Sequence, residues 1–195
     1  MNLKQEQHEE SHRAILKSAR DLIRTQGIAG TRVADVMKGV GLTVGGFYAH
    51  FSSKQDLVDQ ALRAAGSDLM SRFFVGLEHA PNGERAKLVV ERYLSEAHRD
   101  TPACPFPAVI GEIGTTAPEH APALADRIEA LSTRLAELLP RTGKGKVRAR
   151  AIALVALAYG GLSMARALKG TALSEEVLQA CRELAFATID GESKK

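Results

Sequence analysis

Residues 31–51 read TRVADVMKGVGLTVGGFYAHF, and the pattern of this segment is the most informative about the fold. Apolar residues recur at helical spacing from Val33 to Val40 and then give way to glycine, which predicts one short helix. After a turn of three to four residues, a second short helix is expected over about residues 43–50, and Thr31 and Thr43 are placed to cap the two helices. Two short helices joined by such a turn are typical of a helix-turn-helix, whose second helix enters the major groove of DNA.

The sequence on either side of this stretch also predicts helices. Upstream, apolar residues form one face of a helix over Ser11–Gln26, which Gly27 is placed to end. Downstream, Ser52 and Ser53 offer caps for a helix that begins near Lys54. The chain has 30 Ala, 22 Leu and no Trp, a composition that favours helix over strand. We therefore expect an all-α fold, with a helix-turn-helix domain in residues 1–65 and a larger helical domain in residues 66–195.

Length and composition exclude several classes of protein. A chain of 195 residues with 45% hydrophobic content can bury a core, which argues against a disordered tail or a disulfide-stapled miniprotein. Two cysteines cannot make a metal knuckle or a disulfide framework, and no Asp, Glu or His cluster has metal-ligand spacing. The polar N-terminus is unlike a signal peptide, and the apolar run 151–159 is shorter than the roughly 20 residues of a membrane span. We expect a cytoplasmic protein with no membrane association, metal or cofactor.

The formal net charge of +3 conceals an uneven distribution. Residues 1–10 carry a net charge of −2, residues 11–54 carry +5, and the remainder is neutral. A basic segment confined to the region of the predicted helix-turn-helix suggests a local anionic partner. The alternative is a chance fluctuation of a few charges.

The second short helix begins with small residues. Thr43, Val44, Gly45 and Gly46 would let its backbone approach DNA closely, with the N-terminal amides facing phosphates. Glycine is about 1 kcal/mol less favourable than alanine inside a helix, so the pair needs a reason, and close approach to DNA is one. The alternative is that Gly46 allows helix packing while Gly45 faces DNA.

Over roughly residues 11–65 the sequence resembles the TetR-like transcriptional repressors. The resemblance is carried by Gly27, by Thr31 with Val33-Ala34, and by the run Gly41 to Phe51 followed by Lys54, Asp56 and Leu57. Tyr48, His50-Phe51 and Lys54 form its most specific part. The resemblance implies an all-helical homodimer with an N-terminal DNA-binding domain and a larger effector-binding domain, whose last two helices form a four-helix interface with the partner.

The same resemblance implies the contacts with DNA. Thr43 and Tyr48 would contact phosphate, Val44 and Gly45 would approach base edges, and Lys54 would bind the sugar-phosphate backbone of the DNA. Arg32 and His50 are further candidates, against the alternatives of a solvated arginine and a helix-capping histidine. Tyr48 could instead be a core aromatic, while Phe47 and Phe51 are expected in the core. Since Val44 to Gly46 can make few hydrogen bonds, thymine methyl contacts and DNA shape should carry part of the specificity.

The segments 147–168 and 174–189 are apolar on more than one face. Such a terminal hairpin often supplies a subunit interface, because two copies around a two-fold axis cover the second face. The alternative is a hairpin that is internal to a monomer.

The larger domain should hold an effector pocket. Its candidate ligand-binding residues are Phe73, Tyr93, Cys104, Phe106, Ile110 and Met164. Each of the apolar ones could equally be a core residue. Cys104 precedes Pro105 at an expected helix start, where an N-cap position would lower the pKa of its thiol and allow redox or electrophile sensing. The alternative is a buried or bystander cysteine.

The sequence therefore predicts a ligand-responsive regulator, a repressor that a small-molecule effector releases from a palindromic operator of double-stranded DNA. A second hypothesis is a thiol-based sensor through Cys104. The competing class is a small helical enzyme or adaptor that does not bind DNA. We expect no enzyme, because the sequence shows no nucleophile with a base, no paired inward carboxylates and no phosphate-binding loop.

Overall fold

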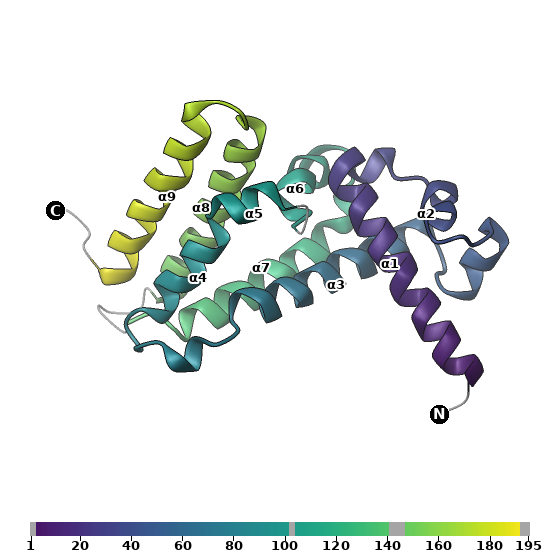
Figure 1. The fold of residues 1–195 in the computed structure, drawn as a ribbon, viewed down its shortest axis with the longest axis horizontal. Coiled ribbons are helices and arrows are strands. Elements are labelled where there is room, and N and C mark those ends of the chain that lie inside the picture. Colours follow the sequence, from purple (N-terminus) through teal and green to yellow (C-terminus); the bar gives the residue numbers. More distant parts are fainter. Residues whose placement is uncertain (1–2, 102–103, 141–146, 192–195) are drawn as a thin grey trace. The chain divides into compact units, whose positions relative to one another are not determined.

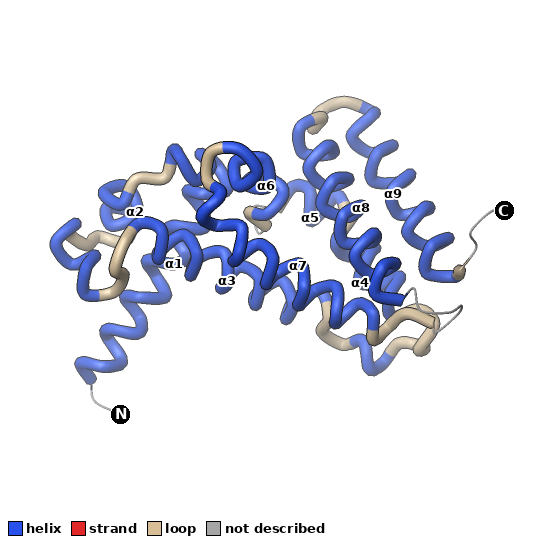
Figure 2. The backbone as a smooth tube through the Cα atoms, turned by 180° about the vertical axis from the view of Figure 1, so that it is seen from behind, coloured by secondary structure: helices blue, strands red, loops and turns tan. Residues whose placement is uncertain are grey.

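The computed structural model describes residues 3–101, 104–140 and 147–191, and the regular structure in these ranges is entirely helical (Figure 1, Figure 2). The all-α expectation is therefore confirmed. The α-helices are α1 (Leu3–Gly30), α2 (Val33–Gly39), α3 (Lys54–Phe73), α4 (Arg85–Tyr93), α5 (Glu96–Asp100), α6 (Phe106–Thr115), α7 (Ala121–Ala136), α8 (Val147–Ala167) and α9 (Ala172–Asp190). Short 3-10 helices are η1 (Val44–Ala49), η2 (Leu77–His79) and η3 (Pro118–His120).

The chain divides into two compact units, and the first is built from two separate pieces of sequence. It combines the chain up to Ser67 with the segment Cys104–Leu124, so α6 and η3 belong with α1, α2, η1 and the first part of α3. Its largest fully buried side chains are Ile15, Ile23, Met37, Phe47, Leu57, Leu62 and Phe106. The sequence-based division placed the whole of residues 66–195 in the other domain, so the position of α6 is a finding of the structure.

Contacts between α1 and α6 hold the two pieces of this first unit together. Gly27 leaves helical geometry at φ 73° and ψ 179°, as expected for a helix stop, and the chain then makes one further turn to Gly30. The Glu112 carboxylate of α6 accepts hydrogen bonds from the backbone N–H groups of Ile28 (3.1 Å) and Ala29 (3.0 Å). It thereby satisfies the amides that a new helical turn leaves without intrahelical partners.

Two helix starts differ from the sequence-based expectation. α1 begins at Leu3 rather than near Ser11, so the polar N-terminal residues are helical. Thr31 does not cap α2, because its hydroxyl donates to the Gly27 carbonyl at 2.7 Å and Arg32 occupies the cap position. The expected start of α3 at Lys54 is confirmed, and the backbone N–H of Asp56 donates to Ser53 Oγ at 3.0 Å, as in a capping box.

The second unit comprises the end of α3, helices α4 and α5, most of α7 and the α8–α9 hairpin. α8 and α9 lie side by side and antiparallel (Figure 1, Figure 2). Gly161 permits their close approach, because a Cβ atom there would lie 2.7 Å from Cys181 Sγ. Arg182 of α9 donates from Nη1 to the Leu94 carbonyl at 2.6 Å, which ties the hairpin to the end of α4.

The helix α8 is long and apolar enough to cross a membrane by length and composition alone. The apolar run 151–159 is the middle part of this helix, which has 21 residues. Core helices pass the same test, and α8 packs against α4, α5 and α9 with Leu154, Tyr159 and Leu162 buried. These contacts are those of a core helix.

Candidate nucleic-acid interface and effector cavity

The helix-turn-helix is positioned by contacts with α1 and by its own core. Ser18 Oγ of α1 donates to the Val36 carbonyl at 3.0 Å, which holds α2 against α1. The turn after α2 uses Gly41 at φ 72°, a left-handed conformation that glycine adopts without strain, and the Leu42 N–H donates to the Met37 carbonyl at 2.9 Å. Val36 and Met37 of α2 and Phe47 of η1 are buried. These contacts hold α2 and the turn that leads into η1 in place.

The predicted DNA contacts on η1 lie on its exposed side. Thr43 occupies the cap position before η1 and is exposed, as are Val44 at 48% and Tyr48 at 73% of their full accessible surface. Phe47 and Phe51 are buried, as expected for core residues. The exposure of Tyr48 contradicts the alternative that it is a core aromatic. Thr43, Val44 and Tyr48 thus form an accessible surface on one short helix.

Gly45 and Gly46 are not required by packing inside the protein. A Cβ atom on Gly45 would have one neighbour within 4 Å, Thr43 Oγ1 at 3.9 Å, and a Cβ atom on Gly46 would lie 3.9 Å from Thr43 Oγ1 and from Met37 Cε. Both distances are ordinary contacts, and neither glycine has a positive φ. The alternative that Gly46 is needed for helix packing therefore has no steric basis in this fold.

Arg32 and Lys54 stand at the starts of the two flanking helices. Arg32 is exposed and makes no side-chain cap hydrogen bond, while Lys54 is half-buried at the first position of α3. A cation at a helix N-terminus opposes the helix dipole, so Lys54 does not serve the stability of α3. An external anion would compensate for both charges.

His50 lies at the end of η1 among other aromatic rings. It stacks on His8 of α1 with ring centroids 4.2 Å apart, and its backbone N–H donates to the Phe47 carbonyl at 2.9 Å. Burial lowers the pKa of His50, and the neighbouring His8 and His12 lower it further, so all three effects favour the neutral ring. Its Nδ1 has no hydrogen-bond partner within the described residues. A neutral ring donates through one nitrogen, so it could still make one hydrogen bond to a phosphate.

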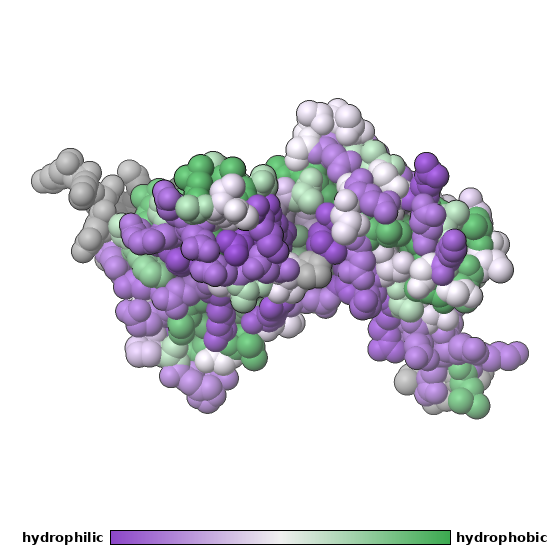
Figure 3. All heavy atoms as spheres, turned by 45° about the horizontal axis from the view of Figure 1, so that its top comes forward, coloured by the Kyte–Doolittle hydropathy of each residue, from purple (hydrophilic) through white to green (hydrophobic). Residues whose placement is uncertain are grey.

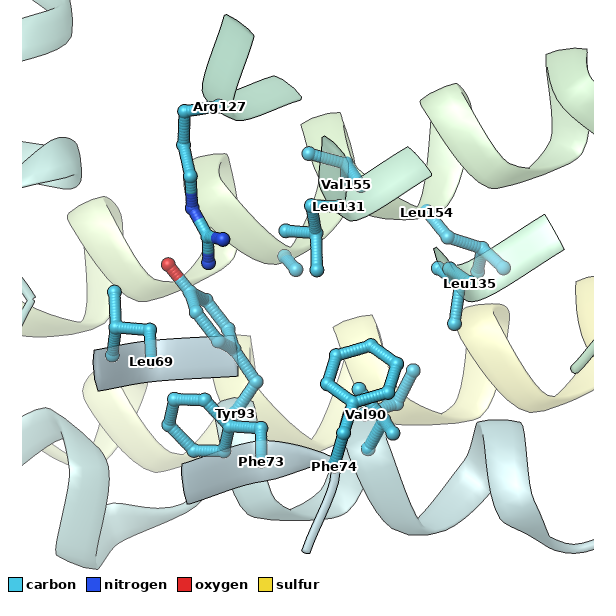
Figure 4. A pocket seen from close by; sticks show the side chains of 12 residues that line it. Leu69, Phe73, Phe74, Val90, Tyr93, Arg127, Leu131, Leu135, Leu154 and Val155 are labelled. Atoms are coloured by element: carbon cyan, nitrogen blue, oxygen red, sulfur yellow. The ribbon is translucent and has the colours of Figure 1, made fainter. Parts of the chain in front are cut away.

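A cavity lies within the second unit between α3, α4, α7 and α8. The volume that admits a water-sized sphere is about 30 Å³, and all the space between the lining atoms, open solvent included, is about 410 Å³. Phe73 and Tyr93, two of the predicted ligand-binding residues, line it. Figure 4 shows these two rings with Arg127, Leu131 and Leu135 of α7 around the same space.

Four of the predicted ligand-binding residues lie elsewhere. Cys104 and Phe106 are fully buried in the first unit, and Ile110 of the same unit and Met164 are 37% and 56% exposed. The sequence prediction missed Arg127, Leu131 and Leu135. Their spacing of four residues on one face of α7 was the available signal, but it is also the pattern of an ordinary core stripe.

The placement of Cys104 does not suit a thiol sensor. The N-cap of α6 is Pro105 rather than Cys104, and the thiol is fully buried. A sensor thiol has to be accessible and to gain a lowered pKa from a helix end or a cation, and Cys104 is neither exposed nor at the cap. The other cysteine, Cys181, has a pKa that burial raises. The structure therefore favours structural roles for both residues.

Beside the cavity, the buried side chain of His98 lies against the rings of Phe73 and Tyr93, and Tyr93 also stacks on Tyr159. The His98 ring lies 4.8 Å from that of Phe73 and 4.7 Å from that of Tyr93, and its Nδ1 is 2.7 Å from the Tyr93 carbonyl. Burial lowers the pKa of His98 to about 4. The ring is therefore neutral at pH 7, and its Nδ1–H donates to that carbonyl.

The α8–α9 hairpin carries apolar side chains on its outer surface as well as in its core. Ile152 and Met164 of α8 and Leu173 and Leu184 of α9 are exposed. Figure 3 shows apolar patches of this kind in green among the purple hydrophilic surface of one face of the molecule.

Among the residues that the structure describes, no three His, Cys, Asp or Glu side chains come together as a metal site.

The N-terminal part of the chain is similar in sequence to known regulatory proteins. Residues 15–61 match the family model described as bacterial regulatory proteins, tetR family. A segment of 59 residues is 34% identical to the HTH-type transcriptional repressor KstR2 of Mycobacterium tuberculosis, and the match spans 30% of this chain and 30% of that protein.

Solved structures are similar over almost the whole chain. A putative TetR-family transcriptional regulator from Rhodococcus sp. has a TM-score of 0.78 at 18% identity, over 93% of this chain and 99% of that one. A TetR-family regulator from Cytophaga hutchinsonii also has a TM-score of 0.78, at 20% identity, over 94% and 96% of the two chains. At these identities the likeness establishes the fold of both units.

Proposed function

We propose that this chain is a transcriptional repressor of the tetR family of bacterial regulatory proteins, whose family model residues 15–61 match, and that it binds operator DNA. In this proposal it binds as a homodimer in the cytoplasm, and a small-molecule effector releases it. The release needs only binding free energy and no chemical reaction, since an effector shifts the protein towards the state that it binds more tightly.

The observation that carries the proposal is the surface of η1. Val44 and Tyr48 are exposed beside two glycines that the protein does not need for its own packing. A backbone without side chains can approach base edges closely, and an exposed tyrosine hydroxyl and threonine hydroxyl can bond to phosphates. Arg32 and Lys54 would then contact the phosphate backbone on either side, which gives the +5 charge of residues 11–54 a function.

The hairpin of α8 and α9 supports the proposed homodimer. On α9, Leu173, Val177, Ala180 and Leu184 follow one another at spacings of four, three and four residues, so they share one face. Leu184 on this face is 58% exposed. A second copy of the same hairpin would cover this face, and the two-fold symmetry of such a dimer would match a palindromic operator.

A gel-shift assay on the DNA that flanks the protein's own gene tests the proposal. We expect a sequence-specific complex that weakens with rising salt, because phosphate contacts release counterions. Lys54→Gln should reduce affinity for every sequence that is bound and lower the slope of log K against log salt by about 1. Lys169→Gln is the matched control, since Lys169 is an exposed lysine of the second unit paired with Asp100 at 3.0 Å.

The absence of any specific complex at moderate salt would contradict the proposed function. Equal affinity losses in Lys54→Gln and Lys169→Gln would remove Lys54 from the proposed contacts, because its effect would then be one of total charge.

A further inference from the structure

The cavity of the second unit has one charged residue in an otherwise apolar lining. Twelve residues line it, and none of them is Asp or Glu. Arg127 is the charged one, and apart from the Tyr93 hydroxyl the remaining side chains are apolar. The wall therefore combines hydrocarbon surface with a single positive charge.

Arg127 is held at this wall by the geometry of α7. It precedes Leu131 and Leu135 by one and two helical turns, so all three side chains leave the same face of the helix. The Arg127 side chain is only 7% exposed, and a guanidinium does not lose its proton in a protein. A carboxylate that reaches this guanidinium would form a charge-assisted hydrogen bond, which is stronger in a poorly hydrated site than in water.

The polar and apolar parts of the wall are separated. Figure 4 shows the Arg127 guanidinium beside the Tyr93 hydroxyl at one end of the cavity, while Leu135 and Leu154 line the other end. An arginine and a hydroxyl side by side are donors suited to a carboxylate. The leucines offer the environment that a hydrocarbon tail requires.

We propose that the effector is an amphiphilic monocarboxylate, with its carboxylate at Arg127 and Tyr93 and its apolar body between Leu131, Leu135 and Leu154. This assignment rests on the proposed function, because it names the class of molecule that releases the repressor. A cationic amphiphile would meet Arg127 with no acidic side chain in the wall to offset the repulsion.

The size of the cavity connects this ligand to regulation. Only about 30 Å³ of the cavity admits a water-sized sphere, which is room for a few water molecules, so a larger ligand must displace lining side chains. Phe74, which lies under the Arg134 guanidinium at 5.9 Å, is half-buried, whereas the other two lining rings, Phe73 and Tyr93, are buried. The ligand therefore binds a state with an expanded cavity more tightly than the state seen in the structure. An effector needs such a difference in affinity between two states.

Calorimetric titration of the full chain with matched probes tests the proposal. The probes are decanoate, decan-1-ol and decyltrimethylammonium, which share a tail and differ in charge, together with the aromatic pair 4-phenylbutanoate and 4-phenylbutan-1-ol. At pH 7 we expect at least one carboxylate to bind tenfold or more tightly than its alcohol, the range of a charge-assisted hydrogen bond, and the ammonium probe not to bind. Arg127→Met should lose that advantage and still bind the alcohol.

Arg148→Met is the control variant, because Arg148 is an exposed arginine of α8 paired with Glu129, and it should bind the probes as the wild type does. Equal binding of both carboxylates and their alcohols by the wild type would overturn the proposal, and so would the absence of carboxylate binding. The comparison within the wild type decides even if Arg127→Met does not fold.

A gel shift with the same probes separates this proposal from the function on which it rests. If the protein binds its operator and the bound carboxylate releases it, both stand. Operator binding that no carboxylate affects overturns the effector assignment alone. Failure to bind any operator, with the carboxylate preference intact, overturns the proposed repressor and with it the assignment of this ligand as an effector.

Discussion

Gly45 illustrates at the scale of one residue how a position can be unfavourable for the fold and useful for binding. Its conformation does not require glycine, and a Cβ atom would meet nothing closer than Thr43 Oγ1 at 3.9 Å. An added methyl group would therefore restrict the unfolded chain and favour η1 without a clash. The space that Gly45 leaves open is on the side that faces solvent.

We expect Gly45→Ala to raise the free energy of unfolding by up to about 1 kcal/mol and to weaken operator binding at the same time. Urea unfolding and a gel shift measure the two effects. Gly83→Ala is a suitable control, because a Cβ atom there would likewise meet no clash, with no neighbour within 4 Å, and Gly83 lies far from η1 in the sequence. Unchanged operator affinity in Gly45→Ala would show that DNA does not approach this position closely.

The buried ring of His98 makes the second unit sensitive to acid. Its pKa is about 4, mainly because burial disfavours the charged ring, and Arg72 and Arg166 add to the effect. In the unfolded chain the ordinary pKa is about 6.5. Between these values the unfolded state takes up a proton that the folded state does not, so stability is lost as the pH falls from 6.5 to 4.

We expect the free energy of unfolding to fall between pH 7 and pH 4.5 by roughly 2–3 kcal/mol more in the wild type than in His98→Gln. Urea unfolding at both pH values gives the two differences, and taking differences removes any change in stability that the substitution itself causes at pH 7. Equal losses in the two proteins would show that His98 does not titrate in this range.

At the scale of elements, Gly27 and Glu112 form one joint between α1 and α6. The backbone of Gly27 lies in a region that is essentially restricted to glycine. A Cβ atom there would fall 2.1 Å from Glu112 Oε1, the atom that accepts from Ile28. A side chain at residue 27 would therefore both strain the backbone and displace the carboxylate.

Gly27→Ala should lower the free energy of unfolding by about 2–4 kcal/mol, from backbone strain together with lost hydrogen bonds. Glu112→Ala should cost about 1–3 kcal/mol. The two costs should not add, because once the carboxylate is gone only the strain at residue 27 remains. Urea unfolding of the two single variants and the double variant measures this coupling, and strictly additive values would contradict the proposed joint.

The elements were predictable to the extent that their signals are local. Helical spacing identified α2, the capping serines placed the start of α3, and Gly27 marked the end of the first helix. The role of Thr31 was predicted wrongly because a threonine before a helix can either cap that helix or donate to a preceding carbonyl, here that of Gly27. Helix spacing could not reveal that η1 is a 3-10 helix, since a six-residue segment fits either period.

At the scale of the whole molecule, the sequence could not reveal which distant segments pack together. Cys104, Phe106 and Ile110 were predicted to line an effector pocket of the larger domain because they lie within residues 66–195, yet they belong to the unit that carries η1. Arg127 gave no signal because a buried and a solvated arginine look alike in sequence. Its role depends on the facing helices α3, α4 and α8.

The proposed dimer is also tested at this scale. Leu184→Glu places a charge in the centre of the exposed apolar face of α9, so we expect it to dissociate the dimer and to weaken operator binding at least tenfold through loss of the second half-site. Multi-angle light scattering gives the mass of the particle. Gln179→Glu adds the same charge to α9 on another face and should remain dimeric. A Leu184→Glu protein that keeps the mass of the wild type would place the interface elsewhere.

The two-piece construction of the first unit limits how its parts can be exchanged between proteins. A fragment cut after Ser67 would carry every residue proposed to contact DNA, but it would lack α6 and with it the Glu112 carboxylate that caps the last turn of α1. A chimeric repressor that takes its DNA-binding unit from this protein therefore has to include residues 104–124 as well. Recombination at the apparent boundary near residue 67 would otherwise separate the DNA-binding unit from part of its own core.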